Sequence, residues 1–420
     1  SSPHSELESA PFLFWMTHQH PELRHRSRSR ERETTCSGDT EDSSSQALSI
    51  SVVTLGGEEI ASVSIPPTAS VGELKRRLEH VLDLPPLRQQ LAYKDRILAT
   101  SAVLKDAGVE DGAAVTLIRG RRKLLTASED CTAALWNVET GERIRSFTGH
   151  ADAVTMAVLS PDGLSVLTAS EDATARLWKT ETGECFRHFV GHAGPLSSAV
   201  FSPNGLLILT SSEDGTAQLW KRYGKKSPAE SFQKFNCSSC SGLWSAVFSP
   251  DSLMVLTASA DKTARLWSSR SSSHCHRSFE GHTGSVLSAA FDAGGAAVLT
   301  ASADCSARLW EVDTGECIQT FHGHTSSVSW AAFSKDASKV FTSSVDRTAR
   351  IWNRDTGHCL QSFSPQGVSV WWCAFCVEDD SSVLTGGGPG ECGIWNADPC
   401  VCLQRFDGHT GAVLWAILSP

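Results

Sequence analysis

The sequence predicts a mostly β protein in which seven similar four-stranded units are arranged radially, preceded by a small α+β domain and a disordered tail. A twelve-residue pattern of the form LTASEDATARLW occurs seven times, beginning at residues 125, 167, 209, 256, 299, 341 and 384. A fixed period of this length is typical of repeat architectures. Residues 48–119 instead alternate apolar and polar positions around a helical stretch, and residues 1–47 have no hydrophobic periodicity.

The composition is that of a soluble globular protein. The chain has 420 residues, 40% of them hydrophobic and 20% charged, with a formal net charge of -10. An acidic balance argues against direct nucleic-acid binding, which normally needs a basic face. The apolar run PFLFWM at 11–16 is too short to span a bilayer. We therefore expect protein partners, no membrane and no small-molecule substrate.

The cysteines follow the repeat instead of forming pairs. Cys185, Cys317, Cys359 and Cys402 recur at one position of the unit, and Cys275 lies close to that position in its own unit. Equivalent positions on different units are too far apart for the ~5.5 Å between Cα atoms that a disulfide needs. We expect reduced, partly buried thiols and hence a cytoplasmic or nuclear protein.

Residues 1–47 are rich in Ser, Arg, Glu and His, and we expect them to be disordered. The run RHRSRSRERE at 24–33 has the composition of a solvated tail. A nuclear signal and a phosphorylatable segment are the alternatives for this run.

Residues 48–119 contain the signals of a hairpin, a helix and further strands. LSISVVTLGGEEIASVSI alternates around a Gly-Gly turn, and Val71, Leu74, Leu78, Val81 and Leu82 recur at helical spacing. Ser70, with Glu73 three residues later, fits a capping box, and Pro85 and Pro86 end the helix. LAYKDRIL and AVTLI supply more strands. VTLGG, LPPLRQQLAY and LKDAGVEDGAAVTLI make this segment resemble the ubiquitin-like, or β-grasp, fold.

This segment departs from ubiquitin at its functional positions. The last strand continues through Arg119 and a single Gly120 into RRKLL, so conjugation through a free Gly-Gly tail is not expected. The three aliphatic positions of the family's recognition patch fall on Leu55, Ala92 and Ile118. Alanine at the middle position removes contact area that binding hot spots need. We interpret the segment as an embedded docking module.

Each unit from residue 121 to 420 has an apolar strand, a turn such as SPDG, the twelve-residue strand–turn–strand, and an outer strand such as GECIQTF that ends on Gly-His. Four short strands per unit, with Gly-His and Trp at fixed offsets, resemble the WD-repeat β-propeller. The Asp that follows Trp in that family is mostly replaced here, as by Asn137 and Lys179.

The resemblance implies a buried hydrogen-bond chain in each unit that joins a His, the Asp of the tight turn, a hydroxyl and the Trp. In the second unit the hydroxyl belongs to Thr168 or Ser170. Thr also survives in the units that lack Asp and His, which favours Ser as the member of the chain. The sets matched by position are His150–Asp172–Trp178, His192–Asp214–Trp220, His282–Asp304–Trp310 and His324–Asp346–Trp352. The fourth and seventh units lack Gly-His.

Strand counting predicts how the ring closes. The first copy has no first strand of its own, and GHTGAVLWAILSP at the other end of the sequence is a first strand with nothing after it. Pairing through residues 412–418 gives seven blades and a fifth set, His409–Asp130–Trp136. The alternative is that further units follow Pro420.

We predict no enzyme, no metal and no cofactor. A Ser–His–Asp triad is disfavoured because the set recurs in most units and its His follows a turn glycine. The CxxC pairs Cys237–Cys240 and Cys373–Cys376 have metal-ligand spacing but lie about three blades apart. GGGPG at 386–390 lacks the Lys-Ser/Thr of a phosphate loop.

The residue before each turn Asp lies on the face that carries the Gly-His loops. It is acidic in three units (Glu129, Glu171 and Glu213) and small or apolar in the next three (Ala260, Ala303 and Val345). This pattern favours a basic, partly apolar peptide as the ligand, against the alternative of solvated turns. The predicted function is a non-catalytic scaffold or adaptor. The alternatives are a substrate receptor or shuttle of the ubiquitin–proteasome pathway and an RNA-processing assembly factor.

Overall fold

The computed structural model describes residues 47–54, 57–82, 89–94, 96–98, 102–119, 122–224, 229–236, 242–270, 274–334, 336–364, 372–376, 379–386, 392–396 and 401–419. The chain divides into two compact units between Gly120 and Arg121. The predicted tail, up to residue 46, lies outside the described residues. No helix in the described ranges is both long and apolar enough to cross a membrane.

The first unit is a five-stranded sheet with one helix. The strand order is β2-β1-β5-β3-β4, with β1 at Leu48–Val53, β2 at Glu59–Ile65, β3 at Gln89–Tyr93, β4 at Arg96–Ile97 and β5 at Ala114–Arg119. Strands β1 and β2 form an antiparallel hairpin, and β1 pairs in parallel with β5. Helix α1 (Val71–Leu82) lies between β2 and β3 in the chain. Hairpin, helix and central parallel pair together give the β-grasp topology.

Helix α1 is fixed by its first turn and by one apolar face. The Ser70 hydroxyl accepts a hydrogen bond from the backbone N–H of Glu73 at 3.2 Å, which is the expected N-cap contact. Val71, Leu74 and Leu78 are fully buried against the sheet. Val81, which the helical spacing assigned to the same face, is 58% exposed because it lies to one side of the stripe formed by positions 71, 74, 78 and 82. The prediction for Val81 was wrong.

The second unit consists of four-stranded antiparallel sheets, which we call blades and number along the ring. In the described residues there are seven. Blade 1 holds β33 (Val413–Leu418), β6 (Lys123–Ser128), β7 (Thr132–Asn137) and β8 (Arg143–Thr148); blade 2 holds β9 (Val154–Leu159), β10 (Ser165–Ser170), β11 (Thr174–Lys179) and β12 (Cys185–Val190); blade 3 holds β13 (Leu196–Phe201), β14 (Leu207–Ser212), β15 (Thr216–Lys221) and β16 (Ser231–Asn236); blade 4 holds β17 (Leu243–Phe248), β18 (Met254–Ser259), β19 (Ala264–Ser268) and β20 (Cys275–Phe279).

Blade 5 holds β21 (Val286–Phe291), β22 (Ala297–Ser302), β23 (Ser306–Glu311) and β24 (Cys317–His322); blade 6 holds β25 (Val328–Phe333), β26 (Lys339–Ser344), β27 (Ala349–Asn353) and β28 (Cys359–Phe363); blade 7 holds β29 (Trp372–Cys376), β30 (Asp379–Gly386), β31 (Cys392–Asn396) and β32 (Val401–Arg405). Blades 2 to 7 each use consecutive strands. Blade 1 combines strands from distant parts of the sequence.

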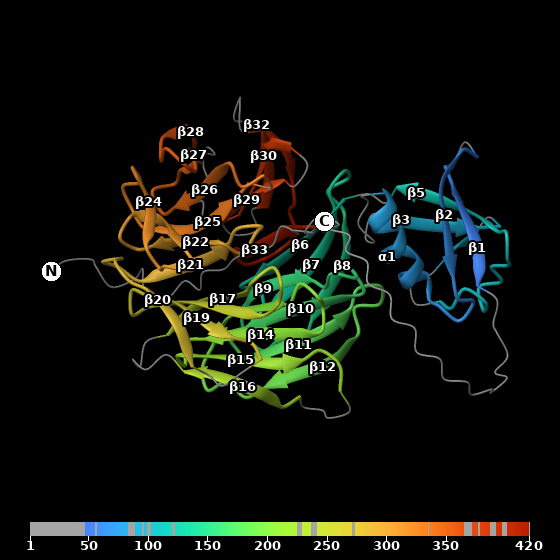
Figure 1. Ribbon diagram of the computed structural model, residues 1–420, viewed down its shortest axis with the longest axis horizontal. Helices are drawn as coiled ribbons and strands as arrows, with labels where there is room; N and C mark the ends of the chain where they lie inside the picture. The colour runs from blue at the N-terminus through green and yellow to red at the C-terminus, as the bar shows by residue number, and fades with distance from the viewer. Residues whose placement is uncertain are drawn as a thin grey trace, which may run out of the picture. The chain divides into compact units, whose positions relative to one another are not determined.

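The blades form a closed ring. The innermost strands contact one another in sequence, and β33 contacts both β9 and β29. Figure 1 shows the outer strands β8, β12, β16, β20, β24, β28 and β32 around the perimeter, with β6, β9, β29 and β33 nearer the middle. Strand β33 pairs antiparallel with β6 in the register Val413↔Ser128 to Leu418↔Leu124. This pairing places β6 inside the sheet, between β33 and β7.

Neighbouring blades are joined by an aromatic pair. In blade 2 the Trp178 ring lies 6.0 Å from Phe147, which comes from the outer strand of blade 1. The same pair recurs in five further seams, with ring centroids 5.6–6.3 Å apart: Phe189–Trp220, Phe235–Trp267, Phe279–Trp310, Phe321–Trp352 and Phe406–Trp136. All twelve rings are buried. The repeated Phe of the outer strands therefore packs across a seam, not within its own sheet.

The repeated cysteines begin the outer strands. Cys185, Cys275 and Cys359 pair with Trp178, Trp267 and Trp352 at a register shift. The thiol of Cys275 donates to the Arg277 carbonyl oxygen two residues later, at 3.2 Å. The eight cysteines for which the structure describes the thiol are free.

Candidate functional site

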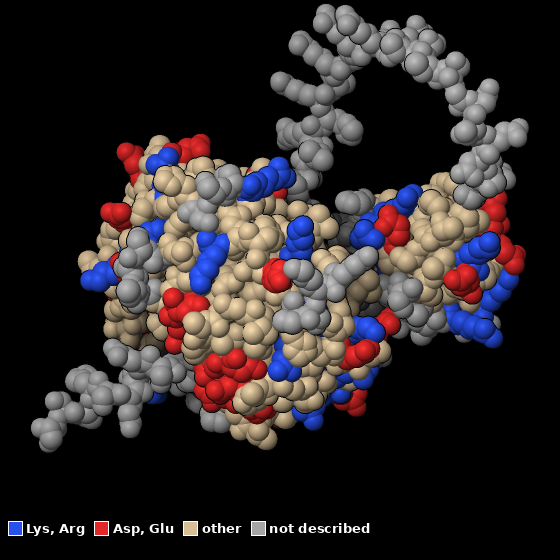
Figure 2. All heavy atoms as spheres, turned by 90° about the horizontal axis from the view of Figure 1, so that it is seen from below, with Lys and Arg blue, Asp and Glu red and all other residues tan. Residues whose placement is uncertain are grey.

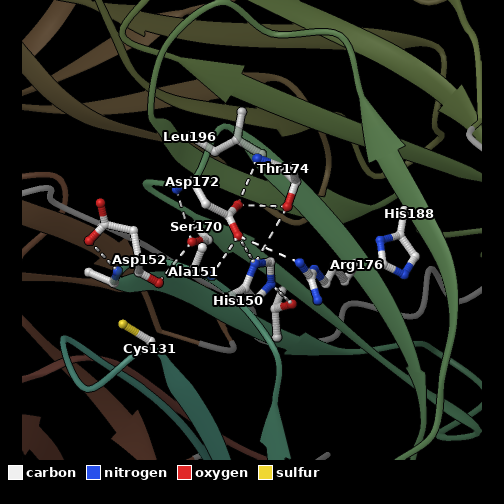
Figure 3. A network of polar contacts seen from close by, with 12 residues as sticks. Cys131, His150, Ala151, Asp152, Ser170, Asp172, Thr174, Arg176, His188 and Leu196 are labelled. Atoms are coloured by element: carbon white, nitrogen blue, oxygen red, sulfur yellow. Dashed lines mark hydrogen bonds and ion pairs between the residues drawn. The ribbon is translucent and has the colours of Figure 1, made fainter.

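The polar network of blade 2 runs between two strands and the loop that enters the blade. The Asp172 carboxylate oxygen Oδ2 lies 2.8 Å from His150 Nδ1. His150 Nε2 lies 2.7 Å from Thr168 Oγ1, which also accepts a hydrogen bond from Trp178 Nε1 at 2.9 Å. Figure 3 shows the Asp172 carboxylate between Thr174 and His150, with Arg176 beside it. The chain of contacts links the entry loop to the second and third strands of the blade.

The protons in this chain all point the same way. Trp178 can only donate, so Thr168 accepts from it and directs its own hydroxyl proton to His150 Nε2. His150 then carries its proton on Nδ1 and donates it to the ionised Asp172. Thr168 and the imidazole of His150 are completely buried. A buried chain whose every member has a partner fixes one arrangement of the strands.

The expectation that Ser is the hydroxyl of the chain was wrong. Ser170 Oγ accepts the backbone N–H of Asp172 at 3.1 Å and donates to the Asp152 carbonyl at 3.0 Å. Ser170 therefore hydrogen-bonds the tight turn to the entry loop, while Thr168 hydrogen-bonds both His150 and Trp178. The two residues are two positions apart on β10 and share one face, so the sequence pattern alone could not separate their roles.

The same chain is present in blades 1, 3, 5 and 6. The His Nδ1 to Asp Oδ2 distances are 2.8, 3.0, 2.7 and 2.8 Å for His409–Asp130, His192–Asp214, His282–Asp304 and His324–Asp346. Trp136, Trp220, Trp310 and Trp352 donate to Thr126, Thr210, Thr300 and Thr342 at 2.8, 2.9, 2.8 and 2.8 Å. The structure thus brings together all five sets named from the sequence.

A second hydroxyl, which sequence reasoning missed, completes the shell of the carboxylate. Thr174 donates its hydroxyl to Asp172 Oδ1 at 2.6 Å, and its backbone N–H donates to the same oxygen at 3.0 Å. Ser306 and Thr348 do the same in blades 5 and 6. The signal was present in the sequence as a Thr or Ser two residues after each turn Asp.

These contacts control ionisation. Burial works against the charge of Asp304, but hydrogen bonds from Ser306 and His282 outweigh it and lower the pKa to about 2. For Asp346, hydrogen bonds from Thr348 and His324 likewise overcome burial and lower the pKa to about 2. Burial lowers the pKa of His282 below its ordinary value, and the bond to Asp304 offsets this only in part. The His282–Asp304 pair is therefore a neutral imidazole with a carboxylate.

The glycine before each network His has no room for a side chain. A Cβ on Gly281 would lie 2.7 Å from Arg308 Nη1 and 3.4 Å from the Trp310 ring, and its φ is +143°. Gly323 is in the same position, with its φ at +146° and Arg350 at 2.6 Å. A left-handed φ and an arginine stacked over the Trp together account for the glycine in blades 5 and 6, whereas Gly191 of blade 3 has no left-handed φ and its Cβ would lie 3.1 Å from the Trp220 ring.

Blades 4 and 7 depart from the pattern in different ways. In blade 4, which is not preceded by Gly-His, Arg265 Nη2 lies 2.7 Å from Asp261 Oδ2, the oxygen that the His contacts in other blades. Trp267 still donates to Thr257 at 2.9 Å. In blade 7, the indole N–H of Trp395 has no hydrogen-bond partner among the described residues. Pro389, which replaces the turn Asp there, lies outside the described ranges.

The Thr hydroxyls of the network are fully buried. No group of three or more His, Cys, Asp or Glu side chains within the described part of the chain could hold a metal ion. Of the predicted CxxC pairs, Cys237 and Cys240 lie outside the described residues, and Cys373 and Cys376 are on β29. Most of GGGPG also lies outside them.

The acidic residues predicted to face a partner lie beside the entry loops. We call this side of the ring, with the tight turns and the loops before the first strands, the GH face. The backbone N–H groups of Glu129, Glu171 and Glu213 donate to Ala412, Ala153 and Pro195 of those loops at 2.9–3.0 Å. Burial raises the pKa of Glu171, and the charges of Asp152, Glu213 and Glu129 raise it further. The four carboxylates therefore form one acidic arc.

Asp152 is the member of this arc that sequence reasoning missed. Its position in the loop is occupied by Gly194, Gly284 and Gly411 in other blades, so an acidic side chain stands out once the loops are aligned. Figure 2 shows one face of the molecule, on which groups of acidic and groups of basic side chains are separated by uncharged surface.

The other side of the GH face is apolar. Ala260 and Ala303 are half-buried, and Val345 is 44% exposed. Their backbone N–H groups donate to Gly242, Ser285 and Ser327 of the neighbouring loops. In the β-grasp unit, Ala92 on β3 is half-buried, whereas Leu55 and the side chain of Ile118 lie outside what the structure describes.

A ring of four-stranded blades with repeated Asp–His–Thr–Trp chains, together with a β-grasp unit, defines a repeat protein of the propeller type with an added small domain. The family model described as "WD domain, G-beta repeat" matches residues 141–179, 183–221, 230–268, 273–311 and 315–353. The ubiquitin family model matches residues 50–122. The chain is a WD-repeat protein with a ubiquitin-like domain before the repeats.

Each matched segment begins just before the outer strand of one blade and ends at the last residue of the third strand of the next. A sequence repeat therefore includes strands of two neighbouring blades. The segment 141–179, for example, contains both His150 and Asp172. A curated relative, guanine nucleotide-binding protein subunit beta-1 of Caenorhabditis briggsae, is 48% identical over 40 residues, which are 10% of this chain and 12% of that protein. The chain thus spans about an eighth of that relative's length.

Proposed function

We propose that this protein is a non-catalytic adaptor whose GH face binds a basic, partly apolar peptide while the ubiquitin-like domain docks a second protein. WD repeats and a ubiquitin-like domain are modules of protein interaction in general. The acidic arc carries the more specific part of the proposal. Burial raises the pKa of Glu171, and the charges of Asp152, Glu213 and Glu129 raise it further, so a bound cation would relieve the repulsion among these carboxylates.

The apolar side supplies the second half of the binding surface. Val345, exposed on the GH face, offers contact area to an aliphatic or aromatic side chain of the same peptide. A ligand with a Lys or Arg at one end and an apolar residue at the other matches both halves. The free thiols of the described cysteines support a reducing compartment, the cytoplasm or the nucleus.

The experiment is affinity capture with the full chain and a matched pair of triple variants. Glu129→Gln, Glu171→Gln and Glu213→Gln together remove charge from the acidic arc. Glu142→Gln, Glu184→Gln and Glu316→Gln remove the same charge from exposed turns between third and fourth strands. We expect the first triple to lose partners that the second keeps, and to lose more of them at low salt. Equal capture by both triples contradicts the proposal.

A role in the ubiquitin pathway is the second candidate, and the ubiquitin family match supports it. Ala92 at the middle of the recognition patch weighs against binding to ordinary ubiquitin receptors. The variant Ala92→Ile restores the aliphatic side chain at that position. If binding of the full chain to proteasome or ligase subunits appears only with Ala92→Ile, the pathway role is contradicted; binding by the unaltered chain supports it.

A further inference from the structure

One cysteine of the repeated position at the start of the outer strands has an imidazole beside its thiol. Cys185 begins β12, and its Sγ lies 3.3 Å from Nε2 of His188, three residues later on the same strand. Both residues are partly exposed, so small solutes have access to them. Because β12 is the last strand of blade 2, the pair lies at the outer edge of the ring, away from the acidic arc of the GH face.

The cysteines at this position in three other blades direct their thiols elsewhere. The thiols of Cys275, Cys359 and Cys317 donate to the backbone carbonyl two residues later, at 3.2, 3.4 and 3.5 Å. For Cys185 that distance is 3.8 Å, and the imidazole is the closer acceptor. The residue three places after the cysteine in the other blades has a hydroxyl group and not a base: Ser278, Ser362 and Thr320. Blade 2 thus differs from these blades in the group that its thiol contacts.

Cys275 of blade 4 is the matched counterpart of Cys185. Both cysteines are partly exposed, and burial raises the pKa of each thiol, although hydrogen bonds to the backbone and the charge of an arginine on the third strand lower it in part. Both thiols are therefore protonated at neutral pH, and a protonated thiol is a poor nucleophile until a base removes its proton. His274 and His276 flank Cys275 in the chain, but among the described residues its thiol hydrogen-bonds neither imidazole.

His188 can act as that base for Cys185. Arg176 pairs with His188 across β11 and β12, and Figure 3 shows Arg176 between His188 and Asp172. Burial lowers the pKa of His188 below its ordinary value, the charge of Arg176 lowers it further, and the charge of Asp172 offsets this only in part. The imidazole is therefore neutral at pH 7, and its Nε2 can accept the proton of the Cys185 thiol.

We propose that the Cys185–His188 pair is a modification site at which hydrogen peroxide oxidises the thiol to a sulfenic acid. His188 Nε2 removes the thiol proton while the sulfur attacks one peroxide oxygen. The S–O bond forms, the O–O bond breaks, and the imidazolium gives the proton to the leaving hydroxide, which becomes water. The sulfur loses two electrons and the peroxide gains them, so no other reactant is needed. Peroxide suits the pair because its leaving group must take up the proton that the imidazole holds.

Oxidation of the full chain by hydrogen peroxide tests the site. Sulfenic acids are trapped with dimedone, and peptide mass spectrometry gives the labelling rate of each cysteine, with Cys275 as the standard within the same molecule. At neutral pH we expect Cys185 to be labelled at least about 10-fold faster than Cys275, as general-base assistance gives. In His188→Ser, which introduces the residue found in blade 4, the two rates should become equal. Equal rates in the unaltered chain overturn the proposal, and so does a difference that persists in His188→Ser.

A reciprocal variant and a pH profile separate a base from a merely structural contact. Ser278→His places an imidazole three residues after Cys275, and we expect the labelling of Cys275 to accelerate. An unchanged rate overturns the proposal, because β12 and β20 have the same register against their third strands. Between about pH 7 and pH 8 the rate at Cys185 should stay nearly constant, since thiol and neutral imidazole are both present, while the rate at Cys275 rises about 10-fold with its thiolate. A 10-fold rise at Cys185 as well would overturn the role of His188.

Discussion

Removing the hydroxyl of Thr300 should destabilise the ring far more than removing the neighbouring Ser302 hydroxyl. Thr300 is fully buried, and its Oγ1 lies 2.8 Å from both His282 Nε2 and Trp310 Nε1. Thr300→Val keeps the shape but leaves two buried polar groups without a partner, at a cost of about 1–3 kcal/mol each. The expected loss is therefore about 2–6 kcal/mol. Ser302→Ala breaks bonds to Asp304 and Gly284 at the edge of the turn and should cost about 1 kcal/mol.

Blade 4 provides the matched control. Thr257 accepts a hydrogen bond from Trp267 at 2.9 Å but has no His beside it. Thr257→Val therefore leaves one buried polar group without a partner, instead of two. Equilibrium unfolding of the full chain in urea, monitored by Trp fluorescence, gives the order Thr300→Val, Thr257→Val, Ser302→Ala from most to least destabilised. Thermal melting gives the same order at roughly 2 °C per kcal/mol. A Ser302→Ala variant less stable than Thr300→Val would refute the assignment of Thr to the chain.

Three further predictions concern stability. Burial holds the pKa values of His150, His282, His324 and His409 below 6.5, so the unfolded chain takes up protons first as the pH falls. Melting temperatures should therefore drop between about pH 7 and pH 5, and a flat or rising profile would contradict the neutral imidazoles. Arg222→Met leaves the Asp162 carboxylate without its cationic partner in the seam and should lower the free energy of unfolding in urea by about 3 kcal/mol. Arg354→Met should cost less, because the single contact of Arg354 with Asp292 is 3.4 Å long. Deleting residues 412–418 removes the buried Val413, Leu414 and Trp415 and should lower the melting temperature by more than either substitution, whereas unchanged melting would show that the ring does not depend on β33.

The repeat made most of the fold predictable. Copies of one pattern fix the period, and each copy contains strand and turn signals at constant offsets, so errors in one unit are corrected by the others. The β-grasp unit has no such redundancy. Its helix was predicted from spacing alone, and Val81, 58% exposed, shows how an apolar residue beside the stripe is misassigned.

The chemistry of the site was less predictable, because it depends on which of two neighbouring groups faces which partner. Thr168 and Ser170 lie on one strand face, and only the register of β10 against β11 places Thr168 beside Trp178. The Phe–Trp pairs were missed for a related reason. Phe147 and Trp178 belong to different blades, and no local pattern records a contact across a seam. Asp152 can be identified from the sequence only by aligning the entry loops, because other blades have glycine at its position.

Blade 4 shows which contact of the network is kept when the His is missing. By motif, that blade is broken, because no His precedes it. By contacts, Asp261 keeps both oxygens satisfied, with Thr263 on Oδ1 at 2.7 Å and Arg265 on Oδ2 at 2.7 Å. The requirement is a donor that anchors the turn carboxylate, and either an imidazole or a guanidinium meets it. Since this requirement is structural, it fixes the turn Asp but not the residue before it. That position is therefore free to be acidic in one part of the ring and apolar in another, and it is the place where the blades can differ in what they bind.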